Sequence, residues 1–196
     1  MGQYDRKDRF YRKAKEEGLA SRASYKLLEI QKKFKVIKRG DIVLDLGAAP
    51  GGWLQVAGEI VGEKGMVFGI DLLPLKIAIP KNVTFHQGDI RDEGSYKEFC
   101  EKNVRADLVV SDMAPNTSGV RFKDAYLSYE LAKAALDITK RFLRPGGNFV
   151  AKIFPGEEFA KFKDELGLYF EKVMQYRPEA TRKTSIEVYL IGLGLK

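Results

Sequence analysis

A glycine-rich turn joins a short apolar segment to a helical pattern early in the chain, and it constrains the fold more than any other feature. Residues 45–53 read D-L-G-A-A-P-G-G-W, after the apolar run 42–44 and before apolar residues at helical spacing up to residue 61. Glycines permit positive φ angles and a close approach of backbone to a ligand, and the first turn of a helix presents free N–H groups. In open α/β sheets, such a strand–turn–helix unit binds nucleotide-like ligands at the carboxyl ends of the strands. We expect the ligand site to include Asp45, Gly47, Ala48, Pro50, Gly51, Gly52 and Trp53.

Two acids that end the next two apolar segments narrow the choice of ligand. Asp71 follows the apolar run 66–70, where a carboxylate can accept both hydroxyls of a ribose, and Asp89 follows residues 83–88, where it would lie beside an adenine. The turn lacks the G-x-G-x-x-G spacing of dinucleotide-binding proteins and the Gly-Lys-Ser/Thr of a phosphate-binding loop. The combination favours S-adenosylmethionine as the cofactor, and the predicted site extends to the neighbouring Leu72 and Ile90. The alternative is a tight turn that binds no ligand.

Apolar strand-like segments alternate with amphipathic helical segments over most of the chain, which is typical of a parallel sheet covered by helices. We predict an α/β fold with a single doubly wound, Rossmann-like sheet of about seven strands, as in S-adenosylmethionine-dependent methyltransferases. The last strand is expected to be antiparallel, because the polar segment 177–185 joins it to the strand before. Strands are expected near residues 42–47, 66–71, 83–88, 107–111, 147–153, 170–176 and 186–193. Helices are expected near residues 21–34, with Ser21 or Ser24 as N-cap, and near 52–61, 94–103, 124–143 and 157–167.

The positive charge of the chain is concentrated at its start. Residues 1–39 hold 13 Lys and Arg against 5 Asp and Glu, whereas the rest of the chain is nearly neutral. Aromatic residues are interleaved with these charges, which is typical of a segment that binds nucleic acid. We therefore expect residues 1–20 to form a basic arm, flexible or ordered only on binding, ahead of one methyltransferase domain over residues 21–196. The alternative is an arm that only adds solubility.

Four charged residues stand in apolar surroundings and predict a reaction centre. Lys152 lies inside the apolar run 147–154, Glu187 precedes an apolar run, Lys26 lies on the apolar side of the first long helix, and Asp112 ends a predicted strand. Lysine is rarely buried without a partner, so each could be a paired surface charge, but together they could neutralise one another around one site. A sugar hydroxyl hardly ionises at neutral pH, and methylating it requires a base, a role that suits a desolvated amine near a second cation. Asp112-Met113-Ala114-Pro115 lacks the aromatic residue that enzymes methylating base amines often carry there.

These motifs together resemble the FtsJ/RrmJ family of ribosomal RNA 2′-O-methyltransferases from about residue 21 to the C-terminus. The matching segments are residues 21–27, 45–53, 71–74, 87–89, 111–116, the strand of Lys152, and 187–189, and residues 76–81 lie outside them. The resemblance implies a catalytic tetrad of Lys26, Asp112, Lys152 and Glu187, with Lys152 as the base. It also implies cofactor contacts by Gly51, Trp53, Asp71, Asp89 and Asp112. The implied reaction is methylation of a uridine 2′-hydroxyl in the peptidyl-transferase region of large-subunit (23S-type) ribosomal RNA.

Three alternative functions remain open at the level of the sequence. The same tetrad could modify transfer RNA or an mRNA cap, although the chain has no obvious aromatic slot for a methylated guanine. A ribosome-assembly factor that only binds RNA would have no use for a buried lysine. A small-molecule O-methyltransferase would not need the basic arm. We expect a cytoplasmic monomer that acts on ribosomal RNA in the large subunit or its precursor, with no metal and no membrane contact.

Overall fold

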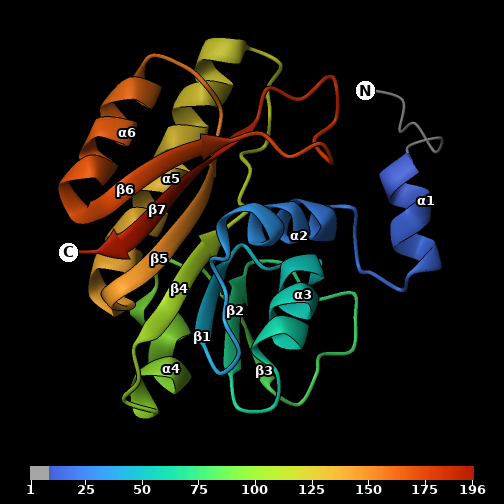
Figure 1. Ribbon diagram of the computed structural model, residues 1–196. Coiled ribbons are helices and arrows are strands. Elements are labelled where there is room, and N and C mark those ends of the chain that lie inside the picture. The colour runs from blue at the N-terminus through green and yellow to red at the C-terminus, as the bar shows by residue number, and fades with distance from the viewer. Residues whose placement is uncertain (1–8) are drawn as a thin grey trace.

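The computed structural model describes residues 9–196 and contains one seven-stranded sheet in the order β3-β2-β1-β4-β5-β7-β6 (Figure 1). The five strands from β3 to β5 are parallel, and β7 runs antiparallel to both of its neighbours, β5 and β6. The predicted doubly wound sheet with an antiparallel last strand is thus confirmed. The strands are β1 (Ile42–Leu46), β2 (Met66–Asp71), β3 (Val83–Gln87), β4 (Ala106–Ser111), β5 (Leu143–Ile153), β6 (Phe170–Tyr176) and β7 (Val188–Leu195).

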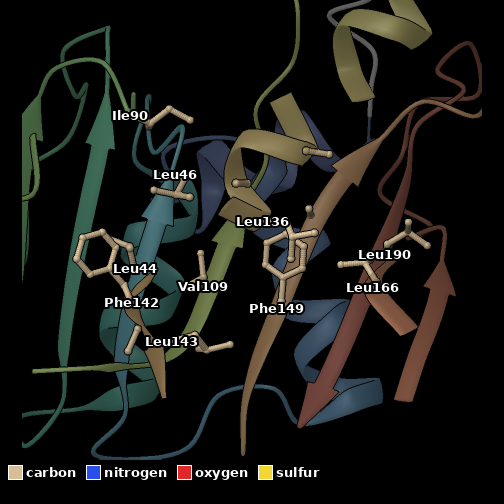
Figure 2. Close-up of a cluster of buried hydrophobic side chains, with 14 of the residues drawn as sticks. Leu44, Leu46, Ile90, Val109, Leu136, Phe142, Leu143, Phe149, Leu166 and Leu190 are labelled. Atoms are coloured by element: carbon tan, nitrogen blue, oxygen red, sulfur yellow. The ribbon is translucent and has the colours of Figure 1, made fainter. Parts of the chain in front are cut away.

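Helices cover both faces of this sheet, because each central strand is apolar on both sides. Leu44 and Leu46 of β1 face the core under α5 and α6, whereas Val43 faces the core under α2 and α3. Figure 2 shows the first of these cores, where Val109 and Phe149 from neighbouring strands lie near Leu136 of α5. The helices are α1 (Arg9–Glu16), α2 (Ala23–Phe34), α3 (Gly52–Val61), the 3₁₀ helix η1 (Glu93–Tyr96), α4 (Lys97–Glu101), α5 (Arg121–Phe142) and α6 (Glu158–Tyr169).

The reversal of strand order fixes the edge at which a ligand can bind. β1 pairs with β2 on one side and with β4 on the other, so the chain winds outward in opposite directions from β1. In such sheets, ligands bind outside the carboxyl ends of the strands at this switch point. The residues that follow β1, β2, β4 and β5 are therefore brought to one edge. Because β7 is antiparallel, its first residue pairs with Ile153 at the end of β5, and the loop before β7 reaches the same edge.

Two local expectations differ from the structure. Helix α1 lies within the segment expected to be loose or ordered only on binding, while residues 1–8 of that segment lie outside the described residues. Ala14 and Phe10 of α1 pack on Tyr25 of α2 together with Ala180, and this small apolar cluster gives the helix a surface to dock on. The helix expected over residues 94–103 is instead η1 followed by the short α4. The Asp92 side chain accepts a hydrogen bond from the Gly94 N–H at 2.9 Å and starts a tight 3₁₀ turn there.

Within residues 9–196, no helix is long and apolar enough to span a membrane.

Candidate active site

The glycine turn after β1 has the backbone geometry that its sequence predicts. Gly47 and Gly51 have φ angles of 82° and 112°, a region that favours glycine. A Cβ atom on Gly51 would lie 2.7 Å from Ile77, and one on Gly47 would overlap Met113. The N–H groups of Gly47 and Ala48 both donate to the Ile70 carbonyl, at 2.8 and 3.1 Å, and anchor the turn to β2. The turn is therefore fixed in place, and its glycines let Met113 and Ile77 pack directly against its backbone.

Asp71 is held against this turn at the end of β2. Its Oδ2 accepts a hydrogen bond from the Ala49 N–H at 2.8 Å, and its Oδ1 accepts one from the Leu73 N–H at 2.8 Å. Each carboxylate oxygen has more than one lone pair. The group is thus oriented by the backbone and can still accept a pair of hydroxyls from a ribose.

Asp45 is a buried acid whose hydrogen-bonding capacity is unused. It is 1% exposed, and neither carboxylate oxygen has a hydrogen-bond partner within residues 9–196. Burial raises the pKa of Asp45 well above its usual value, and the charges of Asp112 and Asp71 raise it further. An unpaired buried polar group is costly, and a ligand that brings a donor or a positive charge would satisfy it. This orphaned acid, the open glycine turn and the oriented Asp71 fit S-adenosylmethionine, which carries an ammonium group and a ribose diol.

The acid predicted beside an adenine has a partner of its own. Asp89 follows β3, and its Oδ2 lies 2.5 Å from Nη2 of Arg91. Hydrogen bonds from Arg91 lower the pKa of Asp89 to about 2. Ile90 packs into the core, where its carbonyl accepts a hydrogen bond from the Tyr96 hydroxyl at 2.5 Å, and the Leu72 side chain is exposed. The carboxylate of Asp89 is thus occupied by an ion pair, and the side chain of Ile90 is occupied by packing in the core.

The segment that follows β2 reaches the glycine turn, which the sequence pattern did not indicate. The Lys76 N–H donates to the Pro50 carbonyl at 3.2 Å, and the Ile77 side chain lies over Gly51. Leu75 also lies within 3.6 Å of the position of a Gly51 Cβ atom. Residues 75–77 therefore line one side of the predicted cofactor site. The apolar side chains of Leu75 and Ile77 are the feature of the sequence that could have indicated this contact.

Four elements bring the predicted tetrad together at the same edge of the sheet. Lys26 comes from α2, Asp112 follows β4, Lys152 lies near the end of β5, and Glu187 immediately precedes β7. The Lys152 ammonium lies 3.0 Å from Oδ1 of Asp112 and donates to the Asp112 carbonyl oxygen at 2.5 Å. The Lys26 ammonium lies 2.5 Å from Oε1 of Glu187 and 3.8 Å from Oδ1 of Asp112. All four side chains are at least five-sixths buried.

The charges of this cluster compensate one another. Burial alone would raise the pKa of Asp112, but Lys152 and Lys26, together with a hydrogen bond from Tyr189, hold it below its usual value. Two ammonium groups thus face two carboxylates in a space with little water. Breaking one partner out of a buried pair leaves an uncompensated charge, which is strongly unfavourable. The four groups therefore depend on one another for their stability in the buried site.

Tyr189 belongs to the cluster and was missed as a site residue. Its hydroxyl donates to Oδ1 of Asp112 at 2.6 Å, and the side chain is fully buried. Burial and the charges of Asp112 and Glu187 raise the pKa of Tyr189 well above its usual value, so the hydroxyl remains a donor. The sequence showed Tyr189 only as an apolar neighbour of Glu187, because a buried strand tyrosine is usually a packing residue.

A joint between α2 and α3 connects the tetrad to the glycine turn. The Ser24 hydroxyl of α2 donates to the Gly52 carbonyl at 3.2 Å, and the Ser21 Oγ accepts from the Ala23 N–H at 3.2 Å. Arg22 occupies the N-cap position without a side-chain capping bond, so neither Ser21 nor Ser24 is the N-cap that the sequence predicted. A Cβ atom on Gly52 would lie 2.7 Å from the Oγ atoms of both serines. Trp53 donates its indole N–H to the Ala23 carbonyl at 2.8 Å, and its ring lies 5.7 Å from that of Tyr189. The Trp53 side chain thus joins the two sites, which leaves its backbone for a ligand.

We expect Tyr189→Phe to lower methyl transfer about tenfold, because a hydrogen bond to a charged group contributes about 1.5–3 kcal/mol. In the wild type the Tyr189 hydroxyl stabilises the ionised form of Asp112. Without this hydroxyl, the pKa of Asp112 is higher in the variant. The acid limb of the pH–rate profile should therefore move to higher pH, which single-turnover rates across a pH series would measure. Tyr176→Phe is the matched control, because it removes a hydroxyl that bonds Glu29. A profile identical to that of the wild type would assign Tyr189 to packing alone.

Comparison with known proteins gives a consistent family. The family model described as FtsJ-like methyltransferase matches residues 19–195. A ribosomal RNA large subunit methyltransferase E of Bdellovibrio bacteriovorus is 46% identical over 195 residues, covering 98% of this chain and 99% of that protein. The protein of the same name from Syntrophobacter fumaroxidans is 45% identical, with 98% of each chain covered.

Two solved structures share the fold. A crystal structure described as that of a ribosomal RNA methyltransferase of Plasmodium falciparum has a TM-score of 0.79 at 28% identity, covering 90% of this chain and 98% of that one. Fibrillarin of Aeropyrum pernix, solved with natively bound S-adenosyl-L-methionine, has a TM-score of 0.58 at 20% identity, covering 87% and 73%. At that level of identity the second similarity supports the fold alone.

Proposed function

Because this chain belongs to the FtsJ-like methyltransferase family, we propose that it methylates a uridine 2′-hydroxyl in large-subunit ribosomal RNA, with Lys152 as the general base. Its relatives of nearly the same length are named for the methylation of large-subunit ribosomal RNA. The observation that supports the chemistry best is the buried cluster of Lys152, Asp112, Lys26 and Glu187 at the carboxyl edge of the sheet. A cluster of this kind is suited to taking a proton from a weak acid.

The methyl donor is S-adenosyl-L-methionine, which supplies an electrophilic methyl group on a sulfonium. In this proposal the Asp71 carboxylate holds the ribose hydroxyls, and the backbone of the turn at Gly51 and Trp53 approaches the cofactor closely. Asp45 meets its positively charged amino acid end, since that acid is buried without a partner in the described chain. Asp89 would contact the adenine side, either through its backbone or after its carboxylate leaves Arg91.

Lys152 is the better candidate for the base than Lys26. The Lys26 ammonium is held at 2.5 Å by Glu187, which stabilises its charge. The family resemblance places the base at the second lysine of the tetrad, which is Lys152, and Asp112 orients its amine from 3.0 Å. The neutral amine would accept the hydroxyl proton while Asp112 holds it in line with the sugar oxygen. Proton transfer to a positioned side chain of this kind contributes about 10²–10⁴-fold to a rate.

The proposed function is tested by transfer of tritium from labelled cofactor into ribosomal particles, followed by mapping of the methylated nucleotide. We expect label in the 2′-O position of one uridine of the large-subunit RNA. Undermodified large subunits, free ribosomal RNA and transfer RNA are compared as substrates. Label on a base nitrogen, on transfer RNA alone or on no RNA would contradict the proposal.

We expect the basic start of the chain to bind the RNA. Residues 1–39 carry the whole excess of positive charge, and the exposed basic residues of α1 extend this charge beyond α2. Removing residues 1–20 should weaken RNA affinity, flatten its dependence on salt and leave cofactor affinity unchanged, because each phosphate contact releases counterions. RNA affinity is measured across a salt series, and cofactor affinity by calorimetry. Exchanging Arg9 and Lys15 for glutamine is a milder variant that keeps the apolar contacts of α1. An unchanged salt dependence would mean that the arm only adds solubility.

A further inference from the structure

The first turn of α5 exposes large apolar side chains that the proposed chemistry does not use. Phe122 is 68% exposed, Val120 just before the helix is 57% exposed, and Tyr126 one turn later is 48% exposed. Phe122 and Tyr126 are four residues apart and therefore lie on the same side of the helix. Exposed aromatic residues grouped in this way usually mark an interaction site.

This group lies at the same edge of the sheet as the tetrad. Helix α5 follows the loop that leaves the carboxyl end of β4 after Asp112, and it ends at Phe142, directly before β5 begins. Its first turns are attached to the end of β5, because the Phe154 N–H donates to the Ser128 hydroxyl at 3.0 Å. Phe154 is two residues beyond Lys152. The exposed aromatics thus stand on an element that is fixed to the strand of the proposed base.

The loop that carries Val120 to this position is held in one shape. The Asp124 carboxylate accepts hydrogen bonds from the Ser118 N–H at 2.7 Å, the Ser118 hydroxyl at 2.9 Å and the Gly119 N–H at 3.0 Å. The bond from the Ser118 backbone, with the other donors, holds the pKa of Asp124 below its usual value. The Asp124 side chain is buried, so its charge is used in hydrogen bonds to the loop and is not displayed on the surface. Phe122 is therefore presented on a preorganised turn.

The charge around these side chains indicates the partner. Arg121 and Lys123 flank Phe122 and are exposed, and residues 113–123 contain no acid. A partner that matches both features carries negative charges spaced by flat apolar faces, which is the chemistry of single-stranded nucleic acid. Aromatic side chains stack on unpaired bases, while neighbouring basic residues contact the phosphates.

We propose that Phe122 is a stacking platform for an unpaired base of the RNA substrate next to the target nucleotide, with Arg121 and Lys123 contacting the adjoining phosphates. The inference rests on the proposed function, because it takes RNA as the substrate. Stacking on Phe122 draws the strand across the edge where Lys152 lies and so helps to place the target sugar. Tyr126 extends the same surface by one helical turn.

The test compares Phe122→Ala with a matched exposed apolar residue, Leu168→Ala. Leu168 is 72% exposed near the end of α6, next to Phe170, which pairs with Leu195 at the opposite edge of the sheet. Binding is measured by fluorescence anisotropy with a short oligouridylate and with an oligomer of the same length whose sugars carry no bases. We expect Phe122→Ala to lose about tenfold in affinity for oligouridylate and nothing for the abasic oligomer, since stacking contributes about 1–3 kcal/mol per base. Phe122→Tyr should restore the affinity, and Leu168→Ala should match the wild type.

Three outcomes would overturn the inference. Equal losses on both oligomers would mean that Phe122 acts without stacking, and no loss on either would remove it from the RNA surface. A wild-type dimer that dissociates on Phe122→Ala, with RNA affinity unchanged, would assign the surface to a second copy of the chain. Failure of the proposed function would look different, as an absence of methyl transfer by the wild-type protein to any ribosomal RNA. Cofactor affinity, measured for every variant, confirms that the fold is intact.

Discussion

Replacing Lys152 with alanine is expected to lower methyl transfer about 1,000-fold while RNA and cofactor still bind. The substitution removes the amine that we propose takes the hydroxyl proton, and general-base catalysis contributes about 10²–10⁴-fold. It also leaves Asp112, among the residues from 9 onward, with Lys26 and the Tyr189 hydroxyl to stabilise its charge. Single-turnover methyl transfer with saturating cofactor and RNA measures the chemical step apart from binding. Arginine at this position should not restore the rate, because a guanidinium does not give up its proton.

The controls separate the loss of a base from the loss of a buried ion pair. Lys133 of α5 forms an ion pair with Glu165 of α6, away from the tetrad, so Lys133→Ala breaks a partly buried pair without touching the site. This variant should keep the full rate. The free energy of unfolding of Lys152→Ala is measured alongside, because breaking a buried pair can cost about 3–5 kcal/mol. A folded Lys152→Ala protein that transfers methyl groups at the wild-type rate would eliminate Lys152 as the base.

Asp71→Ala is expected to weaken cofactor binding about 100-fold, with RNA affinity unchanged. The carboxylate is oriented by the Ala49 and Leu73 N–H groups, and two charge-assisted hydrogen bonds to a ribose contribute about 3 kcal/mol or more together. Isothermal titration with S-adenosylmethionine measures the loss directly. Asp107→Ala is the matched control. Asp107 lies at the start of β4, away from the carboxyl ends of the strands, where it accepts a hydrogen bond from the Ile42 N–H and pairs with Arg144. Normal cofactor affinity in Asp71→Ala would mean that the ribose is held elsewhere.

The sheet was predictable because its determinants are local. Each central strand is a short apolar run between polar segments, and the polar residues 177–185 separate the last two strands. The antiparallel pairing of the last two strands was expected from the polar segment between them, whereas the strand order was not predicted and depends on contacts between segments far apart in the chain. The start of α2 was less predictable, because Ser21 and Ser24 are both good capping residues, yet Arg22 takes the N-cap position and Ser24 instead bonds Gly52. The helix expected over residues 94–103 is divided into η1 and α4, since the capping bond of Asp92 favours a tight 3₁₀ turn at its start.

The members of the tetrad were predictable, but their pairing was not. A charge in apolar surroundings is visible in a sequence, and each of the four has apolar residues at neighbouring positions of its strand or helix. Whether Lys26 pairs with Glu187 or with Asp112 depends on how α2 packs against the loop before β7, which no local pattern encodes. Tyr189 was missed because its hydroxyl becomes important only where it meets Asp112. Ile77 was missed because it follows an irregular segment that folds back over the turn.

The close fit between α2 and α3 has a consequence for how the enzyme responds to its ligands. Ser24 and Gly52 bring the two helices into near contact, and Trp53 binds the backbone of one while touching the ring of Tyr189. We therefore expect occupancy of the predicted donor site and the arrangement of the tetrad to be linked, because both depend on how α2 packs on α3. Under such a linkage, cofactor binding would favour the tetrad geometry before RNA arrives. A side chain added at Gly52 would damage donor affinity and proton transfer together.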